Sequence, residues 1–140
     1  MFFKLPLAWI GGVRVKEVTK ASCIVKIKHR WMNQNPFRSM FWAAQGMAAE
    51  MSTGVLVIQA IQNSGKKVSM LVTDQKGSFT KKATGLIRFE CHDGNTVAKA
   101  IEKSADTGEG QVVKMKSTGY NKEGDSVSNF EFEWSIKVKS

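Results

Sequence analysis

The chain has 140 residues, of which 42% are hydrophobic, and no long low-complexity run, so it can bury a core and we expect residues 1–140 to form a single domain. Its formal net charge of +9 favours anionic partners such as nucleic acid, phospholipid headgroups or phosphate-bearing cofactors, but charge does not choose among them. Residues 1–12 are apolar but interrupted by Lys4 and Pro6 and too short to span a bilayer, so we expect no membrane segment.

Cys23 and Cys91 are the two cysteines of the chain. Since no convincing secretory leader precedes them, we expect a reduced, cytoplasmic protein. Neither the cysteines nor the two histidines have the spacing of a metal site, and we predict no bound metal and no cofactor. Cys91, His92 and Asp93 have the residue types of a catalytic trio, but consecutive residues on a strand point to opposite faces. We interpret Asp93-Gly94 as a turn.

Two segments near the start alternate apolar and charged residues, VRVKEV at 13–18 and CIVKIKH at 23–29. This period of two is typical of half-buried strands, and we predict that a hairpin joins them. The next segment, from about residue 39 to 63, lacks proline and is rich in Ala and Met, which predicts one long helix. Gly65 suits the C-terminus of that helix.

Strand signals return after the helix. The predicted strands are 67–74, 84–91, 110–120 and 128–139. Residues 96–105 fit either a short amphipathic helix or part of a strand. The last strand has one apolar face, which should pack on the long helix: Phe130, Phe132, Trp134, Ile136 and Val138. This order of elements predicts an α+β fold, with an antiparallel sheet of about six strands wrapped on one long central helix.

Glu50 is an isolated acid in the middle of the predicted helix. At about 100° per residue it lies beside Ala43, Val57 and Ile61, and both sides of the helix are rich in apolar residues. A carboxylate in such surroundings loses hydration, which raises its pKa and suits a general base or a group that positions water. The alternative is that Glu50 meets a basic side chain or a backbone amide of a partner subunit.

Asn35 precedes the predicted helix in the stretch NPFRSMFWAAQGMAAE. It can cap the helix, with Pro36 in the first turn, and this is the interpretation that the residues alone favour. It can also lie in a loop that enters a site and donate a hydrogen bond there. The free amides of residues 40–43 can stabilise an anion or the oxygen of a thioester carbonyl near the helix N-terminus.

The order of elements, together with the N-x14-E spacing across NPFRSMFWAAQGMAAE and the following AAEMSTG, resembles the hotdog-fold acyl-CoA thioesterase superfamily. The likeness is closest to a branch near the phenylacetyl-CoA-type thioesterases. It covers nearly the whole chain, from LPLAWIGGVRV to GDSVSNFEFEWSIKVK. The resemblance implies a hotdog fold, a homodimer that can pair into tetramers, and an acyl-CoA or related thioester as the substrate.

The resemblance also implies roles for particular residues. Asn35 takes the position of an Asn that precedes the helix, the N–H of Trp42 polarises the thioester carbonyl, and Glu50 activates water. In the superfamily that amide and the acid commonly come from opposite subunits. Phe41-Trp42-Ala43 replaces an HGG-like motif, so Phe41 lies where the substrate approaches and reshapes the pocket. Ser69, near the start of the next strand, is a candidate for an assisting hydroxyl.

The basic residues have three interpretations: a solvated surface, a nucleic-acid patch, or a cradle for the phosphates of coenzyme A. Lys81 and Lys82 lie between two predicted strands, where a loop can reach such a cofactor. A nucleic-acid role would want aromatic residues interleaved with cations on an exposed sheet face. The aromatic residues of 130–134 are interleaved with Glu instead, so we do not expect nucleic acid as a partner.

Three functions follow from these observations. The first is hydrolysis of an acyl-CoA thioester at an interface pocket of a dimer. The second is a hotdog protein that binds an acyl chain or a CoA ester without turnover. The third is a basic module that binds nucleic acid.

Overall fold

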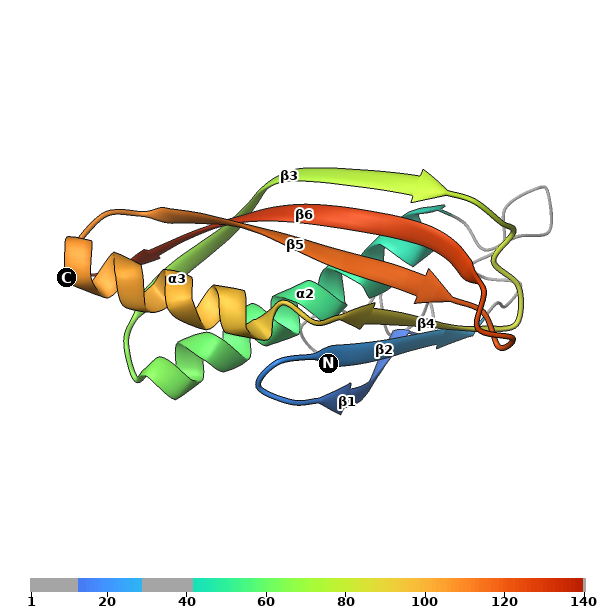
Figure 1. The fold of residues 1–140 in the computed structure, drawn as a ribbon, viewed down its shortest axis with the longest axis horizontal. Coiled ribbons are helices and arrows are strands. Elements are labelled where there is room, and N and C mark those ends of the chain that lie inside the picture. The colour runs from blue at the N-terminus through green and yellow to red at the C-terminus, as the bar shows by residue number, and fades with distance from the viewer. Residues whose placement is uncertain (1–12, 29–41, 140) are drawn as a thin grey trace.

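The structure is a computed structural model that describes residues 13–28 and 42–139. Within these ranges the chain forms strands and helices in the order β-β-α-β-β-α-β-β (Figure 1). Their bounds are β1 Val13–Val18, β2 Cys23–Lys28, α2 Trp42–Ser64, β3 Val68–Phe79, β4 Leu86–Cys91, α3 Gly94–Thr107, β5 Gln111–Tyr120 and β6 Ser126–Val138.

The strands form one antiparallel sheet in the order β1-β2-β4-β5-β6-β3. Figure 1 shows this sheet curving around α2, while α3 runs beside the C-terminal part of α2. The sheet therefore has an inner face that packs on α2 and an outer face that points away from it. This arrangement confirms the predicted α+β fold with about six strands on one long helix.

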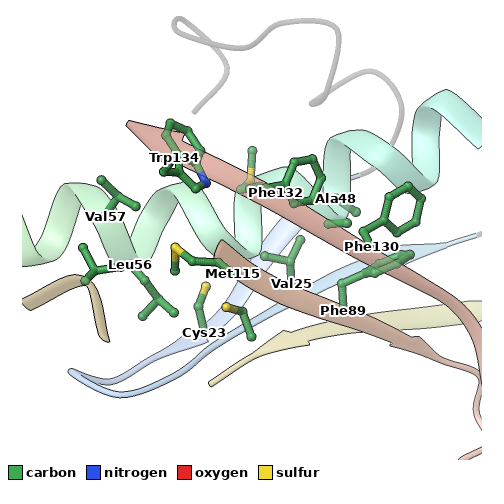
Figure 2. Packing of buried hydrophobic residues seen from close by; sticks show 14 of the residues in the cluster. Cys23, Val25, Ala48, Leu56, Val57, Phe89, Met115, Phe130, Phe132 and Trp134 are labelled. Atoms are coloured by element: carbon green, nitrogen blue, oxygen red, sulfur yellow. The ribbon is translucent and has the colours of Figure 1, made fainter. Parts of the chain in front are cut away.

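The apolar side chains of β6 form much of the inner face, as its alternation predicts. Phe130, Phe132, Trp134 and Ile136 are buried, and Figure 2 shows the three aromatic side chains lying against α2. The rings of Phe130 and Phe132 stack with centroids 6.1 Å apart. Each such side chain contributes about 1.5–3 kcal/mol to folding by leaving water. The position of α2 on the sheet is therefore fixed largely by these contacts.

One strand is longer than predicted, and one segment with two possible structures is a helix. The strand expected at 67–74 continues to Phe79, paired with β6 along its whole length. Gly77 permits this extension, because a Cβ there would lie 2.8 Å from Cε1 of Phe130 on the neighbouring strand. The ambiguous segment 96–105 is helical, within α3.

Asp93 and Gly94 do not form an isolated turn but begin α3, with Asp93 at the N-cap position. The Gly94 N–H donates to the carbonyl of Ala21 over 3.0 Å, which ties the start of α3 to the hairpin between β1 and β2. A Cβ at Gly94 would collide with the Lys20 carbonyl. Only glycine allows this close approach, so the local signal for a turn marks a helix start instead.

Candidate functional site

Glu50 lies in the N-terminal half of α2, on a part of the helix surface that is exposed in the single chain. The neighbouring residues Ala49, Met51 and Ser52 are buried. Glu50 is also the one acidic residue within Trp42–Ser64. The carboxylate therefore stands at the border between the helix–sheet core and the surface.

Two polar contacts set the rotation of α2 on the sheet next to Glu50. Nε1 of Trp134 on β6 donates to Oγ1 of Thr53 over 3.0 Å, and that hydroxyl donates to the backbone carbonyl of Glu50 over 2.8 Å. At the preceding residue, Oγ of Ser52 lies 2.7 Å from Oγ of Ser117 on β5. Because buried polar groups are costly unless they are paired, these contacts hold the helix in one register.

The pKa of Glu50 is raised by burial. Its side chain is accessible to water at the surface, but the protein around it removes part of the hydration that would stabilise the charged form. The raised pKa makes Glu50 a better proton acceptor than an ordinary surface glutamate once it is ionised. A carboxylate of this kind can hold and deprotonate a water molecule.

Trp42 is the first described residue of α2. The first N–H groups of a helix have no carbonyl partner within it and lie at the positive end of the helix dipole, which is the basis of the role predicted for the Trp42 amide. Trp42 and Glu50 are separated by about 12 Å along the helix axis and by about 80° around it. The other two predicted residues of this region, Asn35 and Phe41, lie outside the described residues.

Ser69 lies near the start of β3, opposite Lys137 of β6. Its Oγ donates to the Lys137 carbonyl over 3.4 Å, and its side chain is exposed. Since Lys137 alternates with the buried Ile136, both residues lie on the outer face of the sheet. Within one chain, Ser69 therefore points away from α2 and Glu50.

Lys81 and Lys82 follow β3 and are exposed. Nζ of Lys81 lies 2.9 Å from Oδ2 of Asp125, and this hydrogen bond lowers the pKa of Asp125. More than half of each side chain in this pair is accessible to solvent, at 56% and 54%. An ion pair so exposed contributes little to stability, so Lys81 can exchange Asp125 for another anion at low cost.

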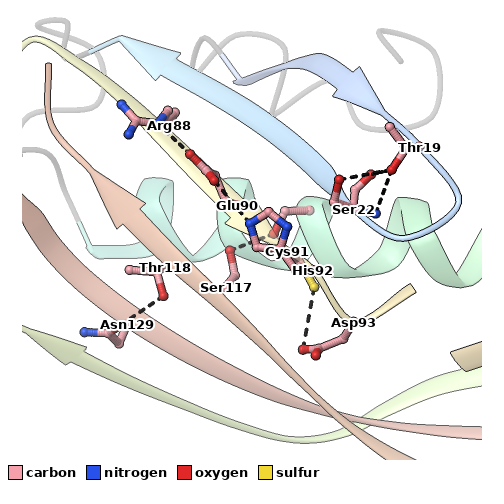
Figure 3. Close-up of polar contacts among 11 residues, drawn as sticks. Thr19, Ser22, Arg88, Glu90, Cys91, His92, Asp93, Ser117, Thr118 and Asn129 are labelled. Atoms are coloured by element: carbon pink, nitrogen blue, oxygen red, sulfur yellow. Dashed lines mark hydrogen bonds and ion pairs between the residues drawn. The ribbon is translucent and has the colours of Figure 1, made fainter. Parts of the chain in front are cut away.

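The side chains of Cys91, His92 and Asp93 do not converge, as the strand geometry predicts for the trio as a whole (Figure 3). His92 Nε2 lies 3.2 Å from Oε1 of Glu90, while Cys91 Sγ lies 3.9 Å from Oδ2 of Asp93. Burial raises the pKa of Cys91 to about 12 and that of Cys23 to about 11, so both thiols stay protonated and are weak nucleophiles.

The described ranges contain neither a cluster of metal-ligating side chains nor a helix that could span a membrane. Within residues 13–28 and 42–139, no three side chains of His, Cys, Asp or Glu come together as they would around a metal ion. In the same part of the chain, no helix has the length and apolar character needed to cross a membrane.

Solved structures place this architecture among the hotdog folds of thioesterase-type proteins. A Pseudomonas aeruginosa protein of unknown function, described as a probable thioesterase, matches at 18% identity with a TM-score of 0.86, over 99% of this chain and 91% of that one. A Chlorobaculum tepidum protein of unknown function matches at 19% identity with a TM-score of 0.84, over 99% and 89%. A thioesterase family protein from Silicibacter pomeroyi matches at 10% identity with a TM-score of 0.74, over 99% and 93%.

These likenesses confirm the predicted hotdog fold, and identities this low speak for the fold alone. No curated protein matches the chain in sequence. The family model of DUF4442, a domain of unknown function, matches residues 1–136. The chain is therefore a member of the DUF4442 family.

Proposed function

We propose that this protein hydrolyses an acyl thioester, with coenzyme A as the carrier of the acyl group and Glu50 as the group that positions and deprotonates water. The observation that carries the proposal is the environment of Glu50, a single acid in α2 that is partly desolvated and has a raised pKa. The hotdog fold supports it, because the proteins of similar structure include a thioesterase family protein and a probable thioesterase.

The proposed reaction uses two groups of α2, the backbone N–H of Trp42 and the carboxylate of Glu50. The Trp42 N–H donates to the thioester carbonyl oxygen and stabilises the negative charge that develops there. Glu50 takes a proton from water as the water oxygen bonds to the carbonyl carbon. The carbon–sulfur bond then breaks, and the leaving thiolate takes up a proton to give a free thiol and a carboxylic acid. We assign Asn35 and Phe41 to the part of this site that the substrate enters.

A homodimer completes this site in our proposal. β3 pairs with β6 on one side, and no described strand pairs with it on the other. An unpaired edge of 12 residues is a template for a second strand. The separation of the Trp42 amide from Glu50 suits a site in which one subunit supplies the amide and its partner supplies the acid. Lys81 and Lys82, near the end of β3, are then candidates to contact the phosphates of coenzyme A.

A non-catalytic protein that binds CoA esters is the second candidate. The sequence favours it at one point, where Phe41-Trp42-Ala43 stands in place of an HGG-like motif. The resemblance implies that these two large aromatic residues stand where the thioester would approach. In this second function Glu50 and the helix N-terminus hold an ester in place but do not cleave it.

The decisive experiment measures thiol release from a panel of acyl-CoA esters by the wild-type protein and by Glu50→Gln. We expect Glu50→Gln to lower kcat by about a hundredfold or more, which is the usual contribution of a general base. Glu102→Gln is the matched control, because Glu102 is an exposed glutamate in the other described helix, α3. Its kcat should equal that of the wild type.

Two other outcomes would redirect the assignment. Turnover that survives Glu50→Gln unchanged would remove Glu50 from the mechanism. If no ester is cleaved but CoA esters still raise the Tm, the binding function replaces the hydrolytic one. Retention on nucleic acid that weakens with salt, with no response to CoA esters, would favour the nucleic-acid module.

A further inference from the structure

A row of cations crosses the outer face of the sheet. Arg14 on β1 is directly opposite Lys26 on β2, and Lys26 is directly opposite Arg88 on β4. Lys26 and Arg88 each alternate with buried residues, such as Val25 and Phe89, so they point away from α2. Because neighbouring strands are about 4.8 Å apart, the three Cα atoms lie within about 10 Å.

A fourth cation joins this row at the irregularity in β1. The register of β1 shifts between Val15 and Glu17, which leaves Lys16 as the extra residue. The pKa of Lys26 is lowered, first by its side-chain contact with Lys16, then by burial and by the positive charges of Lys16 and Arg88. The two ammonium groups are therefore held close to each other. We call Arg14, Lys16, Lys26 and Arg88 the basic row.

Like charges directly opposite each other on neighbouring strands destabilise a sheet. The basic row therefore costs the free protein stability that a neutral residue at Lys26 would restore. The nearest described acid on this face is Glu90, whose Oε2 lies 2.6 Å from Nε of Arg88 and whose Oε1 also contacts His92 (Figure 3). Glu17 on β1 is directly opposite the half-buried Ile24 of β2, two residues before Lys26. The described acids beside Lys16, Lys26 and Arg88 are therefore fewer than these cations.

Arg88 also packs on an aromatic ring of the neighbouring strand. Its guanidinium carbon lies 5.0 Å from the centre of the Tyr120 ring, the residue opposite it on β5. With the Glu90 contact at Nε, the terminal nitrogens of the guanidinium remain available for a ligand above the sheet. Arg88 lies over one face of the Tyr120 ring and keeps a nucleic-acid base from stacking on that face, which favours recognition of charge by the row over recognition of bases.

We propose that the basic row binds a phosphate group of a phosphorylated ligand. A phosphate carries close to two negative charges at neutral pH and presents several acceptor oxygens, which matches cations that approach from three strands. A carboxylate carries one negative charge and would therefore offset less of the repulsion among the cations of the basic row. The site is on the opposite face of the sheet from α2, so it is separate from Glu50 and its function does not depend on thioester hydrolysis.

The test measures the Tm of the whole chain at low ionic strength with sodium pyrophosphate, against sodium chloride at matched ionic strength. We expect pyrophosphate to raise the Tm of the wild type and to bind about tenfold more weakly to Lys26→Gln, the loss typical of one hydrogen bond to a charged group. Lys114→Gln is the matched control, because Lys114 is an exposed lysine of the same outer face, opposite Glu133 on β6. Without ligand, Lys26→Gln should have a higher Tm than the wild type.

A second arm identifies the source of the phosphate. Vesicles of phosphatidylcholine with and without phosphatidic acid are sedimented with the protein. Binding that requires phosphatidic acid and is lost in Lys26→Gln, with no response to pyrophosphate, would assign the site to a lipid headgroup. An equal Tm shift in the wild type, Lys26→Gln and Lys114→Gln would overturn the proposal, as would the absence of any response in both arms. Neither arm involves turnover, so failed thioester hydrolysis leaves the result intact.

Discussion

At the scale of single residues, Glu50 combines two properties that oppose each other. Partial desolvation raises its pKa, which improves it as a base, and the same desolvation makes the ionised side chain unfavourable in the folded chain. An acid kept in such a place at a cost to stability is typical of functional sites, although structural ion pairs can also perturb a carboxylate. Stability and activity should therefore respond in opposite directions when Glu50 is neutralised.

We predict that Glu50→Gln raises the Tm at neutral pH. Since the pKa of Glu50 is higher in the folded chain than in the unfolded chain, its contribution to stability is present below the unfolded pKa and is lost as the pH rises through the folded value. The gain in Tm from Glu50→Gln should therefore be largest at neutral pH and vanish in acid. Thermal unfolding of the two proteins between neutral and acidic pH measures this difference. A gain that stays constant with pH would contradict the ionisation argument.

At the scale of elements, a buried hydroxyl adds a hydrogen bond to the apolar contact between α2 and β6. Thr53 is fully buried and accepts a hydrogen bond from the indole N–H of Trp134. Thr53→Val keeps the shape of the side chain but leaves that indole donor unpaired, which costs about 1–3 kcal/mol. Urea unfolding of the variant measures the loss. Thr73→Val is the control, because the Thr73 hydroxyl bonds to the Glu133 carbonyl from an exposed position on β3. Equal losses of stability in the two variants would show that the buried Thr53 hydroxyl contributes no more than the exposed Thr73 hydroxyl.

The sequence predicts those elements whose pattern is local. The alternation of β6 and the proline-free stretch of α2 each specify an element and its buried face without knowledge of the rest of the fold. The length of β3 is different, because it depends on Gly77 making room for Phe130 on another strand. The start of α3 at Gly94 likewise depends on the distant Lys20 carbonyl.

The candidate site shows the same limit. A lone acid in an apolar helix is visible in the sequence, and in the structure partial burial raises the pKa of Glu50 while the side chain stays exposed in the single chain. The basic row is not visible, because residues 14, 26 and 88 come together only through the registers in which β2 pairs with β1 and with β4. The place of Ser69 at the start of a strand predicts an assisting hydroxyl, but pairing with Lys137 decides which face of the sheet it occupies. A single sequence does not specify such long-range registers.

At the scale of the whole molecule, the two faces of the sheet differ in what they can accept. The inner face is filled by α2 and the core. The outer face carries the basic row at the β1-β2-β4 side, where a second copy would bring like charges together. We therefore expect a partner chain to join the sheet at the β3 edge rather than to stack on the basic row.

We predict that the protein is a dimer at micromolar concentration and that Leu71→Lys shifts it toward monomer. Leu71 is 65% exposed on β3, and lysine on an edge strand opposes the addition of another strand. Val112→Lys is the matched control, because Val112 is 60% exposed on the same face but in β5, on the opposite side of β6 from the β3 edge. Sedimentation measures the state of each protein, and thiol release measures its activity.

In a shared site, Leu71→Lys should lose hydrolysis in step with the loss of dimer, and activity should return as the protein concentration rises. Val112→Lys should keep both properties, because its lysine is on β5 and not on the edge strand β3. This coupling follows from the separation of Trp42 and Glu50 on one helix, which leaves each chain with one half of each proposed site. A wild-type protein that sediments as a strict monomer and still cleaves acyl-CoA would show that one chain supplies both groups, and the shared-site mechanism would fail.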